Sequence, residues 1–113
     1  MSENRRRDPQ SVGLTMKEIA ELVGGRLEGD GGLWVSGIGS VDEADAGQMA
    51  FLARKRYARY APGSRASSFL VSSGLQVYVP SHVPRIIVEE PYRALRTLLK
   101  RFHPPQPHSV RVH

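Results

Sequence analysis

The sequence predicts a single small α/β domain with one mixed β-sheet packed by two to three helices. Three observations support this fold class. A chain of 113 residues is the size of one domain. The segments 15–23 and 91–102 have the apolar spacing of amphipathic helices. Short runs rich in β-branched residues lie between them, and helices that interleave with strands are typical of α/β folds.

The first helix is expected over residues 15–23. Thr15 is a good N-cap, and Glu18 three residues later completes a capping box. Leu14 and Ile19 are spaced for a hydrophobic staple across this start. The helix should end at the pair 24–25, because glycine readily adopts the left-handed conformation that stops a helix.

A turn and two short strands are predicted next. The tetrad "GDGG" at 29–32 reads as the turn. In the strand after it, Trp34, Ser36 and Ile38 should share one face, with Val35 on the other. Gly37 and Gly39 form a G-x-G, but no third glycine or helix follows, so they are predicted to be strand glycines rather than a dinucleotide site.

The second half should contain the remaining elements. An acidic turn feeds a strand at 49–52, and a short helix at 54–61 is stopped by Pro62. The runs "SSFLV", "VYV" and "RIIVEE" are predicted strands. Pro91 should open the last helix, with Leu95, Leu98 and Phe102 buried on one face. The apolar stripe of this helix comprises Tyr92, Leu95, Leu98, Leu99 and Phe102.

The two ends of the chain differ from its middle. We expect residues 1–13 to be a disordered basic tail, 14–102 to be the ordered domain, and 103–113 to be a Pro/His-rich linker. No apolar run is long enough for a membrane span or follows the first arginines as in a signal peptide, which favours a cytoplasmic protein. The absence of cysteine excludes disulfides, thiolate metal sites and cysteine nucleophiles.

Charge is distributed unevenly. Residues 1–50 hold five Lys or Arg against nine Asp or Glu, a net −4. Residues 51–113 hold eleven against two, a net +9. The second half should therefore attract anions, among which phosphate groups are obvious candidates.

The stretch "MAFLARKRYARY" at 49–60 is the candidate binding site. Phe51 at a strand end and Tyr57 in the following helix could stack on the two faces of a flat base, while Arg54 adds positive charge. The alternative is that both rings belong to the core and the cations form a solvated face.

Three segments carry a family resemblance: "LTMKEIAELVGGRLEGDG", "VSGIGSVDEADAGQMAFLARKRY" and "RIIVEEPYRALRTLLKRFHPP". In this order and spacing, they resemble the N-terminal domain of the UDP-3-O-acylglucosamine N-acyltransferases of lipid A biosynthesis. The resemblance implies a nucleotide-binding site for a UDP-sugar (UDP-3-O-acylglucosamine), with uracil stacked between Phe51 and Tyr57. The family has Asn-Pro where this chain has Arg54 and Lys55. Arg54 only donates hydrogen bonds, so the uracil N3–H would need a backbone carbonyl or water.

The resemblance also implies what lies outside this segment. Family members continue into a β-helix of hexapeptide repeats, which forms the homotrimer, binds acyl carrier protein and supplies the catalytic histidine. We expect this chain to lack those repeats, to have no catalytic residue, metal or cofactor, and to be a monomer without acyltransferase activity of its own. His82, His103, His108 and His113 match neither the catalytic position nor a metal site.

Two alternatives remain open. One is the uridine-binding domain of the peptidoglycan ligases that act on UDP-muramoyl peptides, although "SVDEAD" lacks their Asp-Ser-Arg motif. The other is a small basic nucleic-acid-binding protein, which the charge of the second half favours but no known RNA or DNA motif supports.

Overall fold

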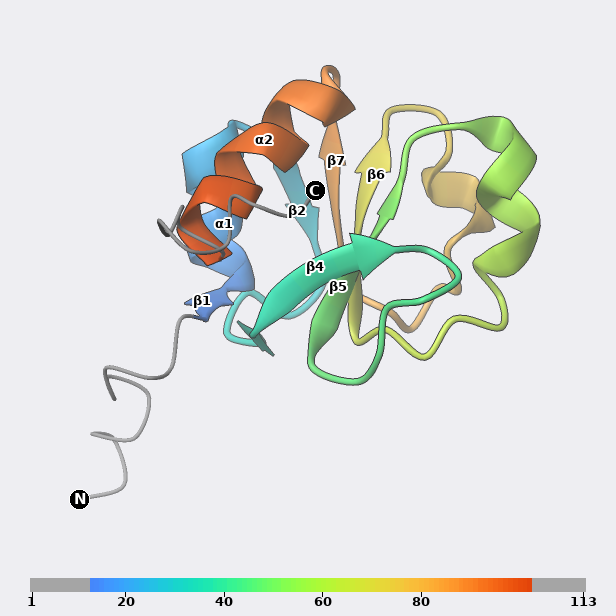
Figure 1. Ribbon diagram of the computed structural model, residues 1–113, viewed down its shortest axis with the longest axis horizontal. Coiled ribbons are helices and arrows are strands. Elements are labelled where there is room, and N and C mark those ends of the chain that lie inside the picture. The colour runs from blue at the N-terminus through green and yellow to red at the C-terminus, as the bar shows by residue number, and fades with distance from the viewer. Residues whose placement is uncertain (1–12, 103–113) are drawn as a thin grey trace, which may run out of the picture.

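A five-stranded mixed β-sheet forms the centre of the computed structural model, which describes residues 13–102 (Figure 1). The strand order is β2-β7-β6-β5-β4; β2 is antiparallel to β7, and all other neighbours are parallel. The bounds are β2 Arg26–Glu28, β4 Gly37–Ser40, β5 Gln48–Leu52, β6 Ser68–Ser72 and β7 Arg85–Val88. The predicted α/β class with a mixed sheet is confirmed.

A second, two-stranded sheet was not predicted. It pairs β1 (Leu14–Thr15) with β3 (Trp34–Val35) in antiparallel register. Ser36 separates β3 from β4, and its N–H and Oγ both donate to the carbonyl oxygen of Gly47, at 2.8 and 3.0 Å. The prediction that Trp34, Ser36 and Ile38 share one strand face is therefore wrong, because the chain changes sheets at Ser36. Gly37 and Gly39 are strand glycines, as predicted.

Helix α1 (Met16–Val23) begins and ends as its sequence predicts. The Thr15 N–H donates to Glu18 Oε1 at 2.9 Å, and the Glu18 N–H donates to Thr15 Oγ1 at 3.2 Å, which completes the capping box. Gly24 is left-handed with φ 68°. Gly25 is needed for a different reason: a Cβ there would lie 2.5 Å from Ile86 Cγ2, so glycine allows the chain to pass close to β7.

Helix α2 (Pro91–Phe102) packs with α1 over one face of the sheet (Figure 1). Leu98 and Phe102 are buried, as predicted, whereas Leu95 is only half-buried and Arg96 is exposed. Ala94 is the third buried position, so the buried residues recur every four positions. The helical-face core contains Ile19, Ile38, Met49, Leu70, Ile86 and Leu98, among others.

The opposite face of the sheet carries the connections between parallel strands. The 3₁₀-helices η2 (Lys55–Tyr60) and η3 (Gln76–Tyr78) lie on this side (Figure 1). The helix predicted at 54–61 is thus present as a 3₁₀-helix. The strand predicted for "VYV" is wrong, because only Val79 of the three residues is buried and the segment lies in a tight connection between Gly74 and Pro80.

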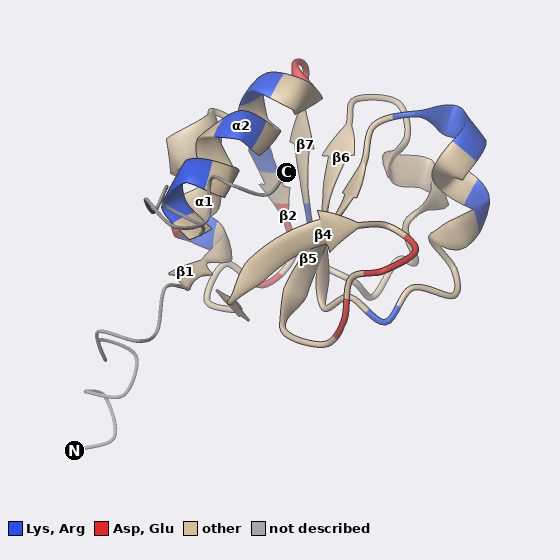
Figure 2. Cartoon of the chain, viewed as in Figure 1, with Lys and Arg blue, Asp and Glu red and all other residues tan. Residues whose placement is uncertain are grey.

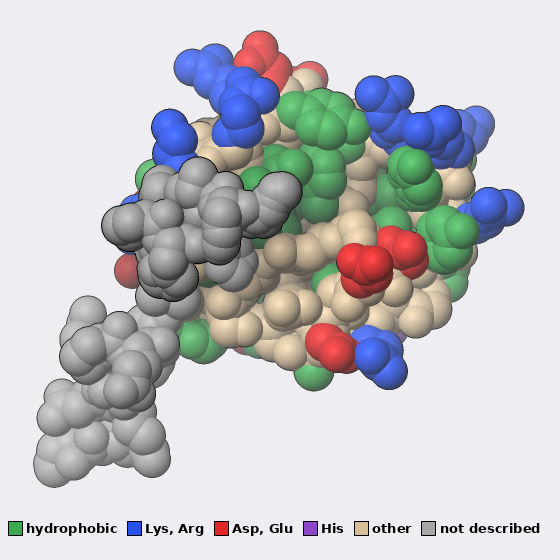
Figure 3. All heavy atoms as spheres, viewed as in Figure 1, with side chains coloured by type: hydrophobic (Ala, Val, Ile, Leu, Met, Phe, Trp, Pro, Cys, Tyr) green, Lys and Arg blue, Asp and Glu red, His purple; other side chains and the backbone are tan. Residues whose placement is uncertain are grey.

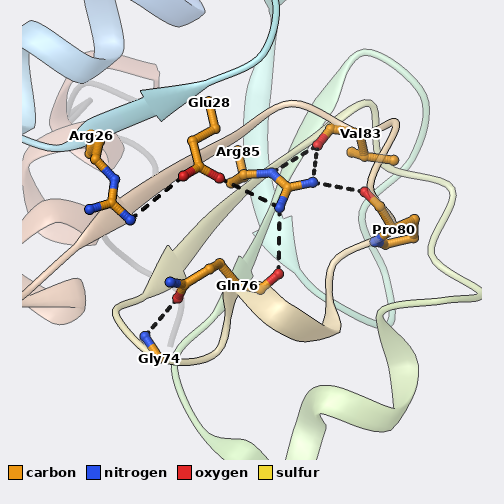
Figure 4. A network of polar contacts seen from close by, with 7 residues as sticks. All are labelled: Arg26, Glu28, Gly74, Gln76, Pro80, Val83 and Arg85. Atoms are coloured by element: carbon orange, nitrogen blue, oxygen red, sulfur yellow. Dashed lines mark hydrogen bonds and ion pairs between the residues drawn. The ribbon is translucent and has the colours of Figure 1, made fainter.

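Arg85 holds that connection in place (Figure 4). Its side chain is only 11% exposed, and each of the three guanidinium nitrogens has at least one oxygen partner. Nε donates to the Val83 carbonyl at 3.1 Å and Nη2 to the Pro80 carbonyl at 2.9 Å. Nη1 reaches the Gln76 carbonyl at 3.5 Å and Glu28 Oε1 at 3.8 Å. Arg85 therefore joins η3, β7 and β2, and we assign it a structural role.

Two expectations concern the chain ends. Apart from Gly13, the tail predicted at 1–13 and the linker predicted at 103–113 lie outside the described residues.

Within 13–102, neither α-helix has the length and apolar character needed to cross a bilayer.

Candidate functional site

The candidate site lies where β4 and β5 end. The two strands are parallel, and their register places Ser40 beside Phe51. The carboxyl ends of parallel strands are the usual place for ligands in α/β sheets, because the loops that follow the strands meet there. The first turn of α2 also reaches this edge, since Tyr92 contacts Phe51.

A pocket of about 340 Å³ opens between these elements. Phe51, Arg54 and Tyr57, the three residues singled out from the sequence, all line it. The other lining residues are Ser40, Val41, Asp42, Glu43, Ala53 and Tyr92. The fold therefore brings three kinds of element to the same pocket. Phe51 lies near the end of β5, Arg54 in the loop after it and Tyr57 in η2.

The two predicted stacking rings are held by different tyrosines. Phe51 is half-buried and packs edge-to-face on Tyr92, with ring centroids 5.4 Å apart and planes at 69°. Tyr57 is 42% exposed and lies beside Tyr60, with centroids 6.4 Å apart. The Arg56 guanidinium also sits 5.0 Å from the centroid of Tyr57. Each ring thus has its own support and leaves aromatic surface in the pocket lining.

Tyr92 is the site residue that sequence reasoning missed. Its place in the apolar stripe of α2 predicted a core residue, but 44% of its surface is exposed. Tyr92 Oη accepts a hydrogen bond from Arg54 Nε at 3.0 Å, and the Arg54 guanidinium lies 5.8 Å from the ring centroid. The spacing of the apolar stripe held no signal of this, because the buried face of α2, which comprises Ala94, Leu98 and Phe102, is visible only in the structure.

Arg54 is positioned by its backbone as well as by Tyr92. It has extended φ and ψ of −130° and 137° and immediately precedes η2, which starts at Lys55. Among the described residues, only Nε of its guanidinium makes a hydrogen bond. The two terminal nitrogens are therefore donors available to an acceptor in the pocket.

The loop after β4 forms the acidic side of the pocket. Its turn is closed by the Glu43 and Ala44 N–H groups, which donate to the Ser40 carbonyl at 3.0 and 2.9 Å. Val41 is buried against the opposite face of the sheet, whereas Asp42 and Glu43 are exposed. Figure 2 shows this acidic loop near the end of β4 and the basic segment after β5 farther along the same edge.

The surface around the pocket combines apolar and basic character. Figure 3 shows hydrophobic side chains gathered between two groups of Lys and Arg, which by comparison with Figure 2 belong to α2 and to the segment after β5. Lys55, Arg56 and Arg59 in η2 are all exposed. A flat ligand that carries negative charge suits such a surface.

Two other hollows formed by the described residues have fewer aromatic rings in their lining. The hollow of about 520 Å³ has one, Tyr60, together with Arg59 and Arg65. A pocket of about 540 Å³ lies between the end of α1 and the start of α2, but its charged residues are Glu21, Glu89, Glu90 and Arg93, and it has no aromatic lining. No group of three or more potential metal ligands exists within residues 13–102. His82 is exposed there, and the other three histidines lie outside the described part of the chain.

Comparison with known proteins gives a consistent result. A family model described as UDP-3-O-(3-hydroxymyristoyl) glucosamine N-acyltransferase, LpxD, matches residues 33–101. A UDP-3-O-acylglucosamine N-acyltransferase from Cytophaga hutchinsonii is 33% identical over 89 residues, which is 79% of this chain and 26% of that protein. Proteins of the same name from Anaeromyxobacter dehalogenans (strain 2CP-C) and Pseudomonas entomophila are 35% and 31% identical over 92 and 94 residues. These matches cover 81% and 83% of this chain. The chain spans about a quarter of the length of these relatives.

Proposed function

Because this chain belongs to the UDP-3-O-acylglucosamine N-acyltransferase family, we propose that residues 14–102 bind the uridine part of a UDP-sugar substrate, UDP-3-O-acylglucosamine. The observation that carries this proposal is that Phe51, Arg54 and Tyr57 line one pocket at the ends of β4 and β5. The contribution of this segment is recognition of the substrate rather than chemistry.

The pocket lining suits each part of a nucleotide. Phe51 and Tyr57 offer aromatic surface on which a base can stack, worth about 1–3 kcal/mol per base. The free donors of Arg54 suit a carbonyl oxygen of the base or a phosphate oxygen. Lys55, Arg56 and Arg59 raise the local concentration of anions around the pocket.

The complete enzyme would act in the cytoplasm in the synthesis of lipid A, and hence of lipopolysaccharide. It would transfer a 3-hydroxyacyl group from acyl carrier protein to the glucosamine amine. We propose that the hexapeptide-repeat part of the family supplies the catalytic histidine, the site for acyl carrier protein and the trimer contacts. Residues 14–102 would then be monomeric by themselves and need neither a metal nor a cofactor.

Titration of UDP into the isotope-labelled protein tests the proposal by NMR. We expect the signals of Phe51, Arg54 and Tyr57 to shift with a common saturation curve. Tyr57→Ala should weaken binding about 5- to 150-fold, because one stacking surface is lost.

Tyr78→Ala is the matched control. Tyr78 is about as exposed as Tyr57 but lies in η3 and does not line the pocket. This variant should bind UDP as the wild type does. Saturating UDP that leaves the pocket signals unshifted, or equal losses in the two variants, would contradict the proposal.

A further inference from the structure

The pairing edge of uracil poses a problem that Arg54 cannot solve. The edge presents a donor, N3–H, between two carbonyl oxygens. Arginine has donors only, so it can bind the carbonyl oxygens but not the N3–H. A buried or stacked donor without an acceptor weakens binding, and a selective site therefore needs an acceptor opposite N3.

The position of Glu43 supplies one. Ser40 and Phe51 are partners in the parallel register of β4 and β5, so their side chains point to the same face of the sheet. Ile38 and Met49, two residues earlier on each strand, are in the core of that helical face. Ser40 Oγ lies 3.4 Å from Glu43 Oε1, a long hydrogen bond that puts the Glu43 carboxylate near Ser40, on the face where Phe51 lies.

The loop that carries Glu43 is well fixed. The Glu43 N–H closes a turn on the Ser40 carbonyl at 3.0 Å, and Val41 anchors the loop in the core on the other face. Within residues 13–102, the side-chain hydrogen bond of Glu43 uses only Oε1. Oε2 is then an acceptor at the pocket wall.

Asp42 is less suited to this role. It lines the pocket too, but it also lines a second hollow of about 520 Å³ together with Arg59, Tyr60 and Arg65. No hydrogen bond holds its side chain beside Phe51 among those the described residues make. Substitution of Asp42 therefore provides a matched control for substitution of Glu43.

On the basis of the proposed function, we infer that Glu43 accepts the uracil N3–H and, with Arg54, determines the preference of this pocket for uracil. Arg54 binds a carbonyl oxygen of the edge, and the carboxylate binds the donor beside it. The negative charge of Glu43 also repels phosphate, so the base, rather than the diphosphate, occupies the part of the pocket next to β4.

The test compares UDP with 3-methyluridine 5′-diphosphate, in which a methyl group replaces the N3 proton. Calorimetry on the full 113-residue chain should show that the wild type binds UDP about tenfold more tightly than the methylated probe. Glu43→Ala should weaken the binding of UDP by about tenfold and change the affinity for the methylated probe by less than about twofold. The preference for UDP then disappears.

Two further variants separate the role of the acceptor from that of charge. Glu43→Gln keeps an acceptor oxygen and should retain most of the preference. Asp42→Asn removes one negative charge from the neighbouring residue. This variant should retain the full preference for UDP over the methylated probe.

The outcomes distinguish the two proposals. UDP binding with pocket NMR shifts, together with an unchanged UDP-to-probe ratio in Glu43→Ala, would overturn the role of Glu43 and leave the uridine-binding function intact. A wild type whose pocket signals do not respond to UDP would overturn both.

Discussion

Two arginines show how the surroundings of one residue type decide its role. Arg54 is exposed, and within residues 13–102 its side chain makes one hydrogen bond, from Nε to Tyr92, which leaves the terminal nitrogens as donors for a ligand. Arg85 is buried, and the carbonyl oxygens of Gln76, Pro80 and Val83 surround its guanidinium. A buried charge is tolerated only where such partners compensate its loss of water.

Removal of the Arg85 guanidinium should strongly destabilise the fold. In Arg85→Met, the apolar stem can remain packed, but the carbonyl oxygens of the 76–84 connection lose their donor. Loss of several hydrogen bonds around a buried charge predicts a cost of about 3–5 kcal/mol in the free energy of unfolding, measured by urea denaturation.

Arg26→Met is the control in the same network, because Arg26 also pairs with Glu28 but its side chain is 65% exposed. Arg26→Met should change the free energy of unfolding by less than about 0.5 kcal/mol. Similar midpoints for the two variants would show that Arg85 does not hold the connection in place.

The sequence grouped some of the residues that line the pocket and missed others. The predicted strand and the helix after it grouped Phe51, Arg54 and Tyr57, and all three line one pocket. Tyr92, Ser40 and Glu43 were not identified as lining residues, because their proximity depends on which strands and helices become neighbours. That neighbourhood is a property of the tertiary fold rather than of any local pattern.

Among the elements, α2 separates its buried and exposed faces clearly. Ala94, Leu98 and Phe102 face the sheet, whereas Leu99 is 38% exposed. Periodicity alone predicted the helix and the burial of Leu98 and Phe102, but it overestimated the burial of Leu95. Elements with a short apolar run were harder to assign, as "VYV" shows, because three residues carry almost no periodicity.

Adjacent leucines in α2 provide a test of this packing. Leu98 is fully buried in the helical-face core, so Leu98→Ala should cost about 2–5 kcal/mol of unfolding free energy by leaving a cavity. Leu99→Ala changes the same side chain at the next position and should cost less than about 1 kcal/mol. Thermal or urea unfolding of the pair measures the difference, and equal costs would refute the assigned helix orientation.

At the level of the whole molecule, the salt dependence of binding distinguishes a nucleotide site from a nucleic-acid surface. The basic second half attracts phosphates in either case. A protein that makes six to ten contacts with a polymer loses about 10³- to 10⁵-fold in affinity between 50 and 200 mM salt. One pocket that holds a single nucleotide has far fewer phosphate contacts to lose.

We therefore expect the affinity for UDP to fall less than about tenfold over that salt range. A single-stranded RNA oligonucleotide, used as the comparison, should bind only weakly and lose its binding as salt rises. Fluorescence anisotropy and calorimetry at several salt concentrations measure both. RNA that binds more tightly than UDP at 200 mM salt would favour the nucleic-acid alternative.

The strand order has a consequence for the synthesis of the protein. β2 pairs only with β7 in the five-stranded sheet, although almost sixty residues separate their positions in the chain. At about 5–20 residues per second, the ribosome makes Arg26–Glu28 roughly 3–12 s before it makes Arg85–Val88. During this interval the nascent N-terminal strand has no partner, so the domain cannot close its sheet until nearly all of it has been translated.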